Sequence, residues 1–173
     1  MQTATAEKVF TRDTSDLVKH NFNGYDFLTI GTDEPSDKLK ALAVTLRDED
    51  YCTGQIKFED MPVIIEEELS DYHVRDNSFQ VWQNLEMYKT KEWSERDYDV
   101  MTDSEADKAW DESLDSYIDE CLDIPENVRF YFDEEKWKDD AKIDGRGHSL
   151  NRYDGSEEEA NINDTDYYIY RTN

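Results

Sequence analysis

The excess of acidic residues is the feature that most limits what this chain can fold into. Its 173 residues include 44 Asp and Glu against 19 Lys and Arg, a formal net charge of -25. Such charge usually accompanies disorder, because a self-repelling chain buries too little apolar surface to offset the entropy of ordering. Disordered acidic segments are poor in aromatic residues, whereas this chain has 11 Tyr, 7 Phe and 4 Trp. We therefore expect a folded protein with an acidic surface.

The charge also restricts the possible partners. Phosphates of nucleic acid and anionic lipid headgroups would be repelled by nearly every face, so neither nucleic acid itself nor a membrane is an expected ligand. A basic groove that holds DNA or RNA on another protein has the complementary charge. No apolar run is longer than four residues, and residues 1–19 contain no hydrophobic signal segment. The sequence therefore predicts a cytoplasmic protein of the host cell.

Hydrophobic patterning predicts an α+β fold, with a small antiparallel sheet and acidic amphipathic helices. We expect an N-terminal α+β part (residues 1–100) and a C-terminal acidic part (residues 101–173) within one compact unit. Apolar residues at helical spacing after Pro35 predict a helix, and residues 63–69 predict a short one. Strands are expected at residues 25–30, 55–58 and 167–170. Residues 71–98 fit strands and an irregular helix equally well.

The clearest local signal is a helix that begins after Thr102. The sequence Thr102-Asp103-Ser104-Glu105 has the form of a capping box, in which the threonine and glutamate side chains satisfy exposed backbone amides. Apolar residues then recur at three-and-four spacing as far as Leu122. The remaining face is acidic, although like charges four residues apart destabilise a helix by a few tenths of a kcal/mol each. Carboxylates at that spacing repeat about every 6 Å, a charge density comparable to that of a nucleic-acid strand.

We expect the carboxylates of this helix and of a short helix from Asp133 to form a partner-binding surface that stands in for phosphates. A run of charge is usually a solvated face, but an ordinary solvated helix would include more lysines, and here the acidity persists over segments separated by turns. The densest row is expected through Asp107, Asp111, Asp115 and Asp119. The full set of expected partner-binding residues is Asp103, Glu105, Asp107, Asp111, Glu112, Asp115, Asp119, Glu120, Asp123, Asp133, Glu134 and Glu135.

Residues 124–141 carry a resemblance to a known family. The run Ile-Pro-Glu-Asn-Val-Arg-Phe-Tyr-Phe-Asp-Glu-Glu-Lys-Trp-Lys-Asp-Asp-Ala resembles the C-terminal signature of ArdA-type antirestriction proteins, which have an Ile-Pro-Glu-Asn-like turn, then Tyr-Phe-Asp and an aromatic residue such as Trp137. The acidic helix after Thr102 lies where that family has one. The tail, with Gly145-Arg146-Gly147 and Tyr167-Tyr168-Ile169-Tyr170, is similar to small acidic proteins of phages and mobile elements. The resemblance covers at most residues 100–170.

The resemblance implies a DNA mimic that occupies the DNA groove of a Type I restriction-modification enzyme, that has no catalytic residues and that is often a homodimer. The same acidic surface would suit a CRISPR effector. The expected function is therefore antirestriction or anti-CRISPR inhibition of a basic nucleic-acid-binding protein. Two alternatives stay open: a phage or mobile-element adaptor that binds a basic host protein without mimicry, and a cryptic metal-dependent hydrolase.

Signals for catalysis are weak. His20, His73 and His148 lack the spacing of zinc ligands. The segment from Asp140 to Gly145 departs from a calcium loop, because a lysine replaces the second ligand. We therefore expect no enzyme activity, no catalytic residue, no metal and no cofactor.

The remaining unusual residues have ordinary structural interpretations. Cys52 and Cys121 are expected as reduced, buried thiols. Gly145-Arg146-Gly147 is expected as a turn that does not lead into a helix. Three tryptophans are expected in the core: Trp93, Trp110 and Trp137. Four cations are expected to hold the C-terminal hairpin to nearby carboxylates: Arg146, His148, Arg152 and Arg171.

Overall fold

The computed structural model describes residues 16–49, 57, 61–66, 77–84 and 93–173. Several sequence predictions fall on residues outside these ranges. They concern nearly all of the strand at residues 55–58, residues 67–69 of the short helix predicted at 63–69, part of the ambiguous segment 71–98, Cys52, His73 and the side chain of Trp93.

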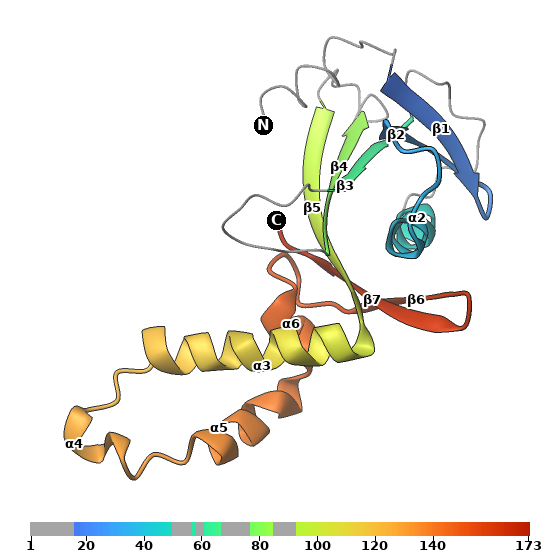
Figure 1. Ribbon diagram of the computed structural model, residues 1–173. Coiled ribbons are helices and arrows are strands. Elements are labelled where there is room, and N and C mark those ends of the chain that lie inside the picture. Colours follow the sequence, from blue (N-terminus) through green and yellow to red (C-terminus); the bar gives the residue numbers. More distant parts are fainter. Residues whose placement is uncertain (1–15, 50–56, 58–60, 67–76, 85–92) are drawn as a thin grey trace.

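A seven-stranded sheet forms the body of the molecule (Figure 1). Its order is β1-β2-β3-β4-β5-β7-β6, and all neighbours are antiparallel except β2 and β3, which are parallel. The strands are β1 (Leu17–Phe22), β2 (Tyr25–Ile30), β3 (Val63–Glu66), β4 (Ser78–Asn84), β5 (Trp93–Thr102), β6 (Glu158–Ile162) and β7 (Thr165–Arg171). The predicted α+β class is confirmed. The sheet is larger than the small antiparallel sheet that the sequence predicts, and one of its strand pairs is parallel.

Tight hairpins form both ends of the sheet. Asn23-Gly24 joins β1 to β2 with φ values of 49° and 84°, and Asn163-Asp164 joins β6 to β7 with 51° and 63°. Positive φ at both central residues is typical of the type I′ turn, whose twist matches that of the flanking strands. Asn, Asp and Gly tolerate this conformation, so these short sequences fix the register of the two hairpins.

Helix α2 (Asp37–Glu49) covers one face of the sheet and closes the main core (Figure 1). Leu39, Leu42 and Leu46 recur on one face of the helix and are at most 1% exposed. They pack among inward-facing side chains of β2 to β7. At the start of the helix, the Leu39 amide donates to Ser36 Oγ at 3.2 Å. The strand predicted at residues 25–30 and the helix predicted after Pro35 are confirmed.

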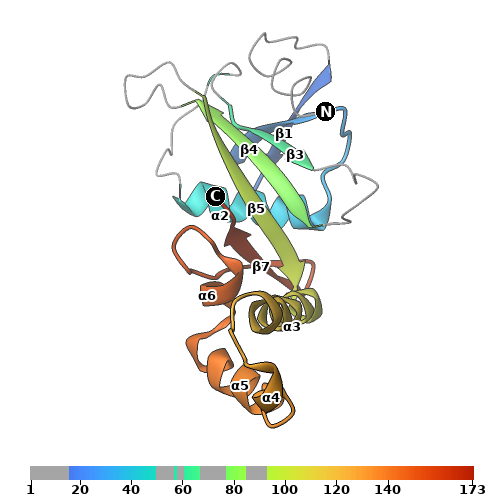
Figure 2. The ribbon, with the colours of Figure 1, turned by 90° about the vertical axis from the view of Figure 1, so that its left-hand side faces the viewer.

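Strand β5 runs directly into a helical arm that projects from the sheet (Figures 1 and 2). We define the arm as residues 103–145, which include α3 (Asp103–Glu120), α4 (Glu126–Arg129), α5 (Glu134–Ala141) and η4 (Lys142–Asp144). Helix α6 (Arg146–Leu150) then leads back to the β6–β7 hairpin. The helices predicted after Thr102 and from Asp133, and the strand predicted at residues 167–170, are confirmed.

The arm and the sheet are joined through one continuous strand and a small apolar cluster. The predicted division between residues 100 and 101 falls inside β5, which pairs with β4 on one side and β7 on the other. Met101, Ala106 and Tyr170 are buried together, and Leu150 of α6 packs against them. The base of α3 is therefore held against the sheet by residues that are distant in sequence.

Three local predictions were wrong. Residues 63–66 form β3 instead of a helix, because a β-branched run fits a strand that is paired on both sides. Arg146 and Gly147 are the first two residues of the short helix α6, and Gly145 is its N-cap, so this segment is not a turn that ends without a helix. Cys121 is exposed, since it lies at the C-terminal cap of α3 beyond the last buried turn.

Candidate functional site: a helical arm with an acidic tip

The acidic face of α3 carries five aspartates at four-residue intervals, which we call the aspartate row: Asp103, Asp107, Asp111, Asp115 and Asp119. The chain after α3 turns back along this face and brings cations to it in reverse order. Arg129 contacts Asp119, and Lys138 contacts Asp115. Lys142 Nζ lies 2.7 Å from Asp111, and Arg146 Nη1 lies 3.0 Å from Asp107 and 2.8 Å from Asp103. Every aspartate of the row thus has a cation within the same chain.

These ion pairs affect the protonation of both partners. The hydrogen bond from Lys142 holds the pKa of the Asp111 carboxyl below its ordinary value of 3.8. The hydrogen bond to Asp115 raises the pKa of the Lys138 ammonium. Both shifts favour the charged forms of Asp111 and Lys138.

Aromatic packing holds the return segment against α3. Trp137 of α5 stacks on Tyr117, with ring centroids 5.7 Å apart and planes 11° from parallel. Trp110 Nε1 donates to Ser149 Oγ at 3.1 Å, and Lys142 Nζ lies 5.5 Å from the Trp110 ring centroid. Both tryptophans are half-buried, so the prediction that they belong to the core was wrong: they pack between helices of the arm and its base.

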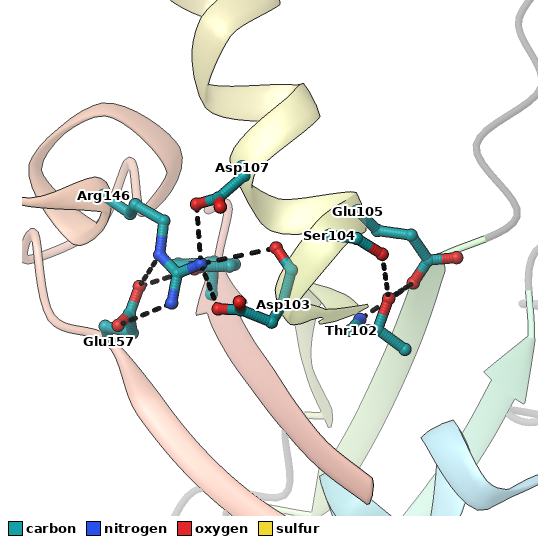
Figure 3. Close-up of polar contacts among 8 residues, drawn as sticks. Thr102, Asp103, Ser104, Glu105, Asp107, Arg146 and Glu157 are labelled. Carbon is teal, nitrogen blue, oxygen red and sulfur yellow. Dashed lines mark hydrogen bonds and ion pairs between the residues drawn. The ribbon is translucent and has the colours of Figure 1, made fainter.

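Arg146 is the most enclosed of these cations, with a side chain only 12% exposed (Figure 3). Besides the two aspartates, its guanidinium donates to Glu157 Oε2 at 3.1 Å and lies 4.3 Å from the Tyr168 ring centroid. Tyr170 Oη donates to the same glutamate at 2.6 Å. Burial acts to lower the pKa of Arg146, but its hydrogen bonds to carboxylates outweigh burial and raise that pKa. The structure places Arg146 as predicted, between the start of the hairpin and neighbouring carboxylates.

Among the described residues, the other three cations expected to hold the hairpin do not form a comparable cluster with carboxylates. Arg171 lies over the Tyr153 ring at 3.5 Å from its centroid, and its Nε donates to the Asn173 carbonyl at 2.6 Å. His148 and Arg152 are exposed. The role predicted for all four residues therefore falls mainly to Arg146.

Glu105 has a structural role at the start of α3. Its Oε2 accepts from the Thr102 amide at 2.8 Å, and the predicted capping box is present (Figure 3). Lys38 Nζ lies 2.8 Å from the other carboxylate oxygen, which ties α2 to α3. Burial acts to raise the pKa of Glu105, but the hydrogen bonds from Lys38 and Thr102 lower it below the ordinary value.

The predicted partner-binding residues therefore divide into two groups. Those that have a cation beside them are the five aspartates of the row, Glu105, and Glu112, which lies 3.7 Å from Lys108 Nζ. The others are exposed and gather where α3 ends and the chain turns back. These are Glu120, Asp123, Asp133, Glu134 and Glu135. Asp133 also caps α5, where its carboxylate accepts from the Lys136 amide at 3.0 Å.

We call residues 120–135 the arm tip. It lies at the end of the arm farthest from the sheet (Figure 1). Phe130 is 92% exposed and Tyr131 is 81% exposed, and their rings meet edge to face with centroids 5.5 Å apart. Sequence patterning did not single out these two residues or Glu126 as a site. The available signal was three consecutive aromatic residues within an otherwise acidic stretch.

Comparisons with known proteins add no further information. No protein-family model, curated protein or solved structure matches this chain. The resemblance of residues 100–170 to ArdA-type antirestriction proteins therefore stays a prediction. Within the described ranges, no three His, Cys, Asp or Glu side chains are placed to hold a metal ion, and no helix is both long and apolar enough to cross a bilayer.

The ion pairs between α3 and α5 can be tested by removing their cations. We expect Lys138→Gln with Lys142→Gln to lower the free energy of unfolding by about 0.5–1 kcal/mol, because Lys138 is only 19% exposed and Lys142 35%. The control pair Lys108→Gln with Lys136→Gln removes the same charge from side chains that are 77% and 70% exposed, and we expect a smaller loss. Denaturant unfolding measures both. Equal losses would contradict a structural role for the longer-range pairs.

The stability lost in the Lys138/Lys142 variant should depend on pH. The pKa of Asp111 in the folded protein lies below its ordinary value of 3.8, so its pairing stabilises the fold above that value. This stabilisation is lost as the pH falls through the lowered pKa. We therefore expect the difference between wild type and the Lys138/Lys142 variant to shrink when unfolding is measured at progressively lower pH below 3.8.

Proposed function

We propose that this chain inhibits a basic nucleic-acid-binding protein, such as a restriction-modification enzyme or a CRISPR effector, by occupying its nucleic-acid groove. The observation that carries the proposal is the charge and position of the arm. Residues 103–144 hold 16 acidic residues against five basic ones, and they project from the sheet on α3 (Figure 1). A basic groove attracts such an arm from a distance and gains counterion release when it binds.

Within the arm, the tip is the better candidate for contact with phosphate-binding residues. A carboxylate that already has a lysine or arginine beside it gains less from a new cation and must exchange partners. The exposed carboxylates at residues 120–126 have no ion pair among the described side chains. We therefore assign the first contact with the groove to the arm tip, and a supporting role to the aspartate row.

Affinity capture tests the proposal. The immobilised full chain is exposed to a lysate of the host cell at low and raised salt, with and without added DNA, both duplex and single-stranded. We expect it to retain a nucleic-acid enzyme that is lost as salt rises and is displaced by DNA. Retention of a partner that is indifferent to both forms of DNA would contradict mimicry and would favour the adaptor.

Two charge-matched variants test which carboxylates make the contact. The tip variant combines Glu120→Gln, Asp123→Asn and Glu126→Gln, and the row variant combines Asp111→Asn, Asp115→Asn and Asp119→Asn. Each removes three negative charges. We expect the tip variant to bind the captured enzyme about 10-fold to 100-fold more weakly, on the order of 0.5–1 kcal/mol per charge.

The row variant has a different expected outcome. Its main effect should be on stability, because Lys142, Lys138 and Arg129 lose their partners. Titration calorimetry with the captured enzyme and thermal unfolding of each variant separate the two effects. Equal weakening of binding by both variants would show that total charge, not the tip, determines the contact.

A further inference from the structure

Two aromatic rings at the arm tip face solvent with nothing packed over most of their surface. Chain reversal is fixed by backbone hydrogen bonds, from the Tyr131 amide to the Val128 carbonyl at 2.9 Å and from the Phe132 amide to the Arg129 carbonyl at 3.1 Å. Phe132 is half-buried, whereas Phe130 and Tyr131 point outward. Val128 beside them is 43% exposed. The turn therefore presents a contiguous apolar surface made of several side chains, and not one isolated exposed ring.

Exposed apolar clusters on a folded protein commonly mark contacts with other molecules. The charge around this cluster restricts what that molecule is. Asp123, Glu126 and Asp133 are exposed on either side of it in the sequence, so a second copy of the tip would bring like charges together. The occupant that fits is a pocket with an apolar floor and a basic rim.

A groove that binds single-stranded nucleic acid has this chemistry. It combines Lys and Arg side chains along the backbone with surfaces on which unpaired bases stack. In a duplex, base faces are covered by neighbouring bases and only base edges are accessible. Exposed ring faces beside carboxylates therefore match an unstacked strand better than they match a duplex.

We propose that Phe130 and Tyr131 stand in for unstacked bases and enter a base-stacking pocket of the target, while the carboxylates of the arm tip occupy adjacent phosphate sites. This inference rests on the proposed function and narrows it to a target that binds single-stranded DNA or RNA, or that unstacks a base. The aromatic pair supplies the anchor, and the carboxylates supply steering and orientation.

Photo-cross-linking tests the contact directly. The variant Phe130→benzoylphenylalanine is irradiated in host lysate, and Ile143→benzoylphenylalanine is the control. Ile143 is also on the arm and is 81% exposed, which equals the exposure of Tyr131, but it lies outside the tip. We expect a cross-linked protein from position 130 and not from position 143. The cross-link should be lost at a lower concentration of single-stranded oligonucleotide than of duplex. Equal cross-linking from both positions, no cross-link from position 130, or a cross-link that resists the single strand would overturn the inference.

Affinity measurements with the captured enzyme give a second test. We expect Phe130→Ala with Tyr131→Ala to weaken binding at least tenfold, and Ile143→Ala to change it less than twofold. Thermal unfolding should be unaltered in both, because these side chains are exposed. If the wild type retains a DNA-displaced enzyme but the double variant binds it equally well, the ring contact is wrong while the proposed function stands. If the wild type retains only a DNA-indifferent partner, the proposed function itself fails.

Discussion

Replacing Arg146 by alanine is expected to lower the free energy of unfolding by about 1–2 kcal/mol, because charge-assisted hydrogen bonds from an enclosed guanidinium to three solvent-accessible carboxylates are lost. The guanidinium contacts Asp103, Asp107 and Glu157 and is only 12% exposed. Without it, these three carboxylates lose the cation that they share. Because these contacts join α3 to the segment before β6, the loss should also expose the base of the arm to hydrogen exchange.

Two further variants make the Arg146 prediction specific. Arg146→Lys keeps the charge but loses the planar set of donors, so we expect it to recover only part of the stability. Arg152→Ala removes a nearby exposed arginine and should change the free energy of unfolding by less than about 0.5 kcal/mol. Denaturant unfolding measures all three. A loss in Arg146→Ala no greater than in Arg152→Ala would contradict a central role for this cation.

Gly147→Ala is expected to lower the free energy of unfolding by about 2–3 kcal/mol, within the range found when atoms are added to a fully packed site. A Cβ at residue 147 would lie 3.0 Å from both the carbonyl carbon and the oxygen of Ser156, and still closer to the carbonyl oxygen of Gly155. These are backbone atoms, so no rotamer change relieves the contact. Helix α6 or the loop before β6 must move instead.

The neighbouring His148→Ala provides the control for Gly147→Ala. His148 lies on the same short helix but is exposed, so we expect a change within about 0.5 kcal/mol. Thermal or denaturant unfolding distinguishes the two variants. A wild-type melting temperature in Gly147→Ala would mean that the loop at residues 155–156 yields without cost, which the close approach argues against.

The elements that the sequence predicted correctly are those with strong local signals. The capping box at Thr102, the leucines of α2 and the aromatic, β-branched run at residues 25–30 are patterns of neighbouring residues, so they can be recognised without knowing the tertiary structure. Residues 63–66 were misassigned because Pro62 and the following glutamates favour a helix start, whereas pairing with β2 and β4 decides the outcome. The parallel β2–β3 pair has no local signature at all.

The candidate site was predictable in composition but not in pairing. Sequence reasoning identified the acidic face of α3 and treated the repulsion along it as unrelieved. Lys138, Lys142 and Arg146 recur at the same four-residue interval as the aspartates. This shared spacing was the sequence signal that the cations of the return segment pair with the aspartate row. The pairing of each cation with its aspartate depends on how the segment after α3 runs back along that helix, and only the tertiary structure defines this. Exposure of Phe130 and Tyr131 is likewise a tertiary property.

The direct passage of β5 into α3 also determines the reach of the protein. Eighteen residues of α helix span about 27 Å, and no flexible linker separates them from the last strand. Under the proposed function, a target bound at the arm tip is kept away from the sheet by the length of this helix. In that arrangement, the described strands of the sheet stay clear of the target while the tip is engaged.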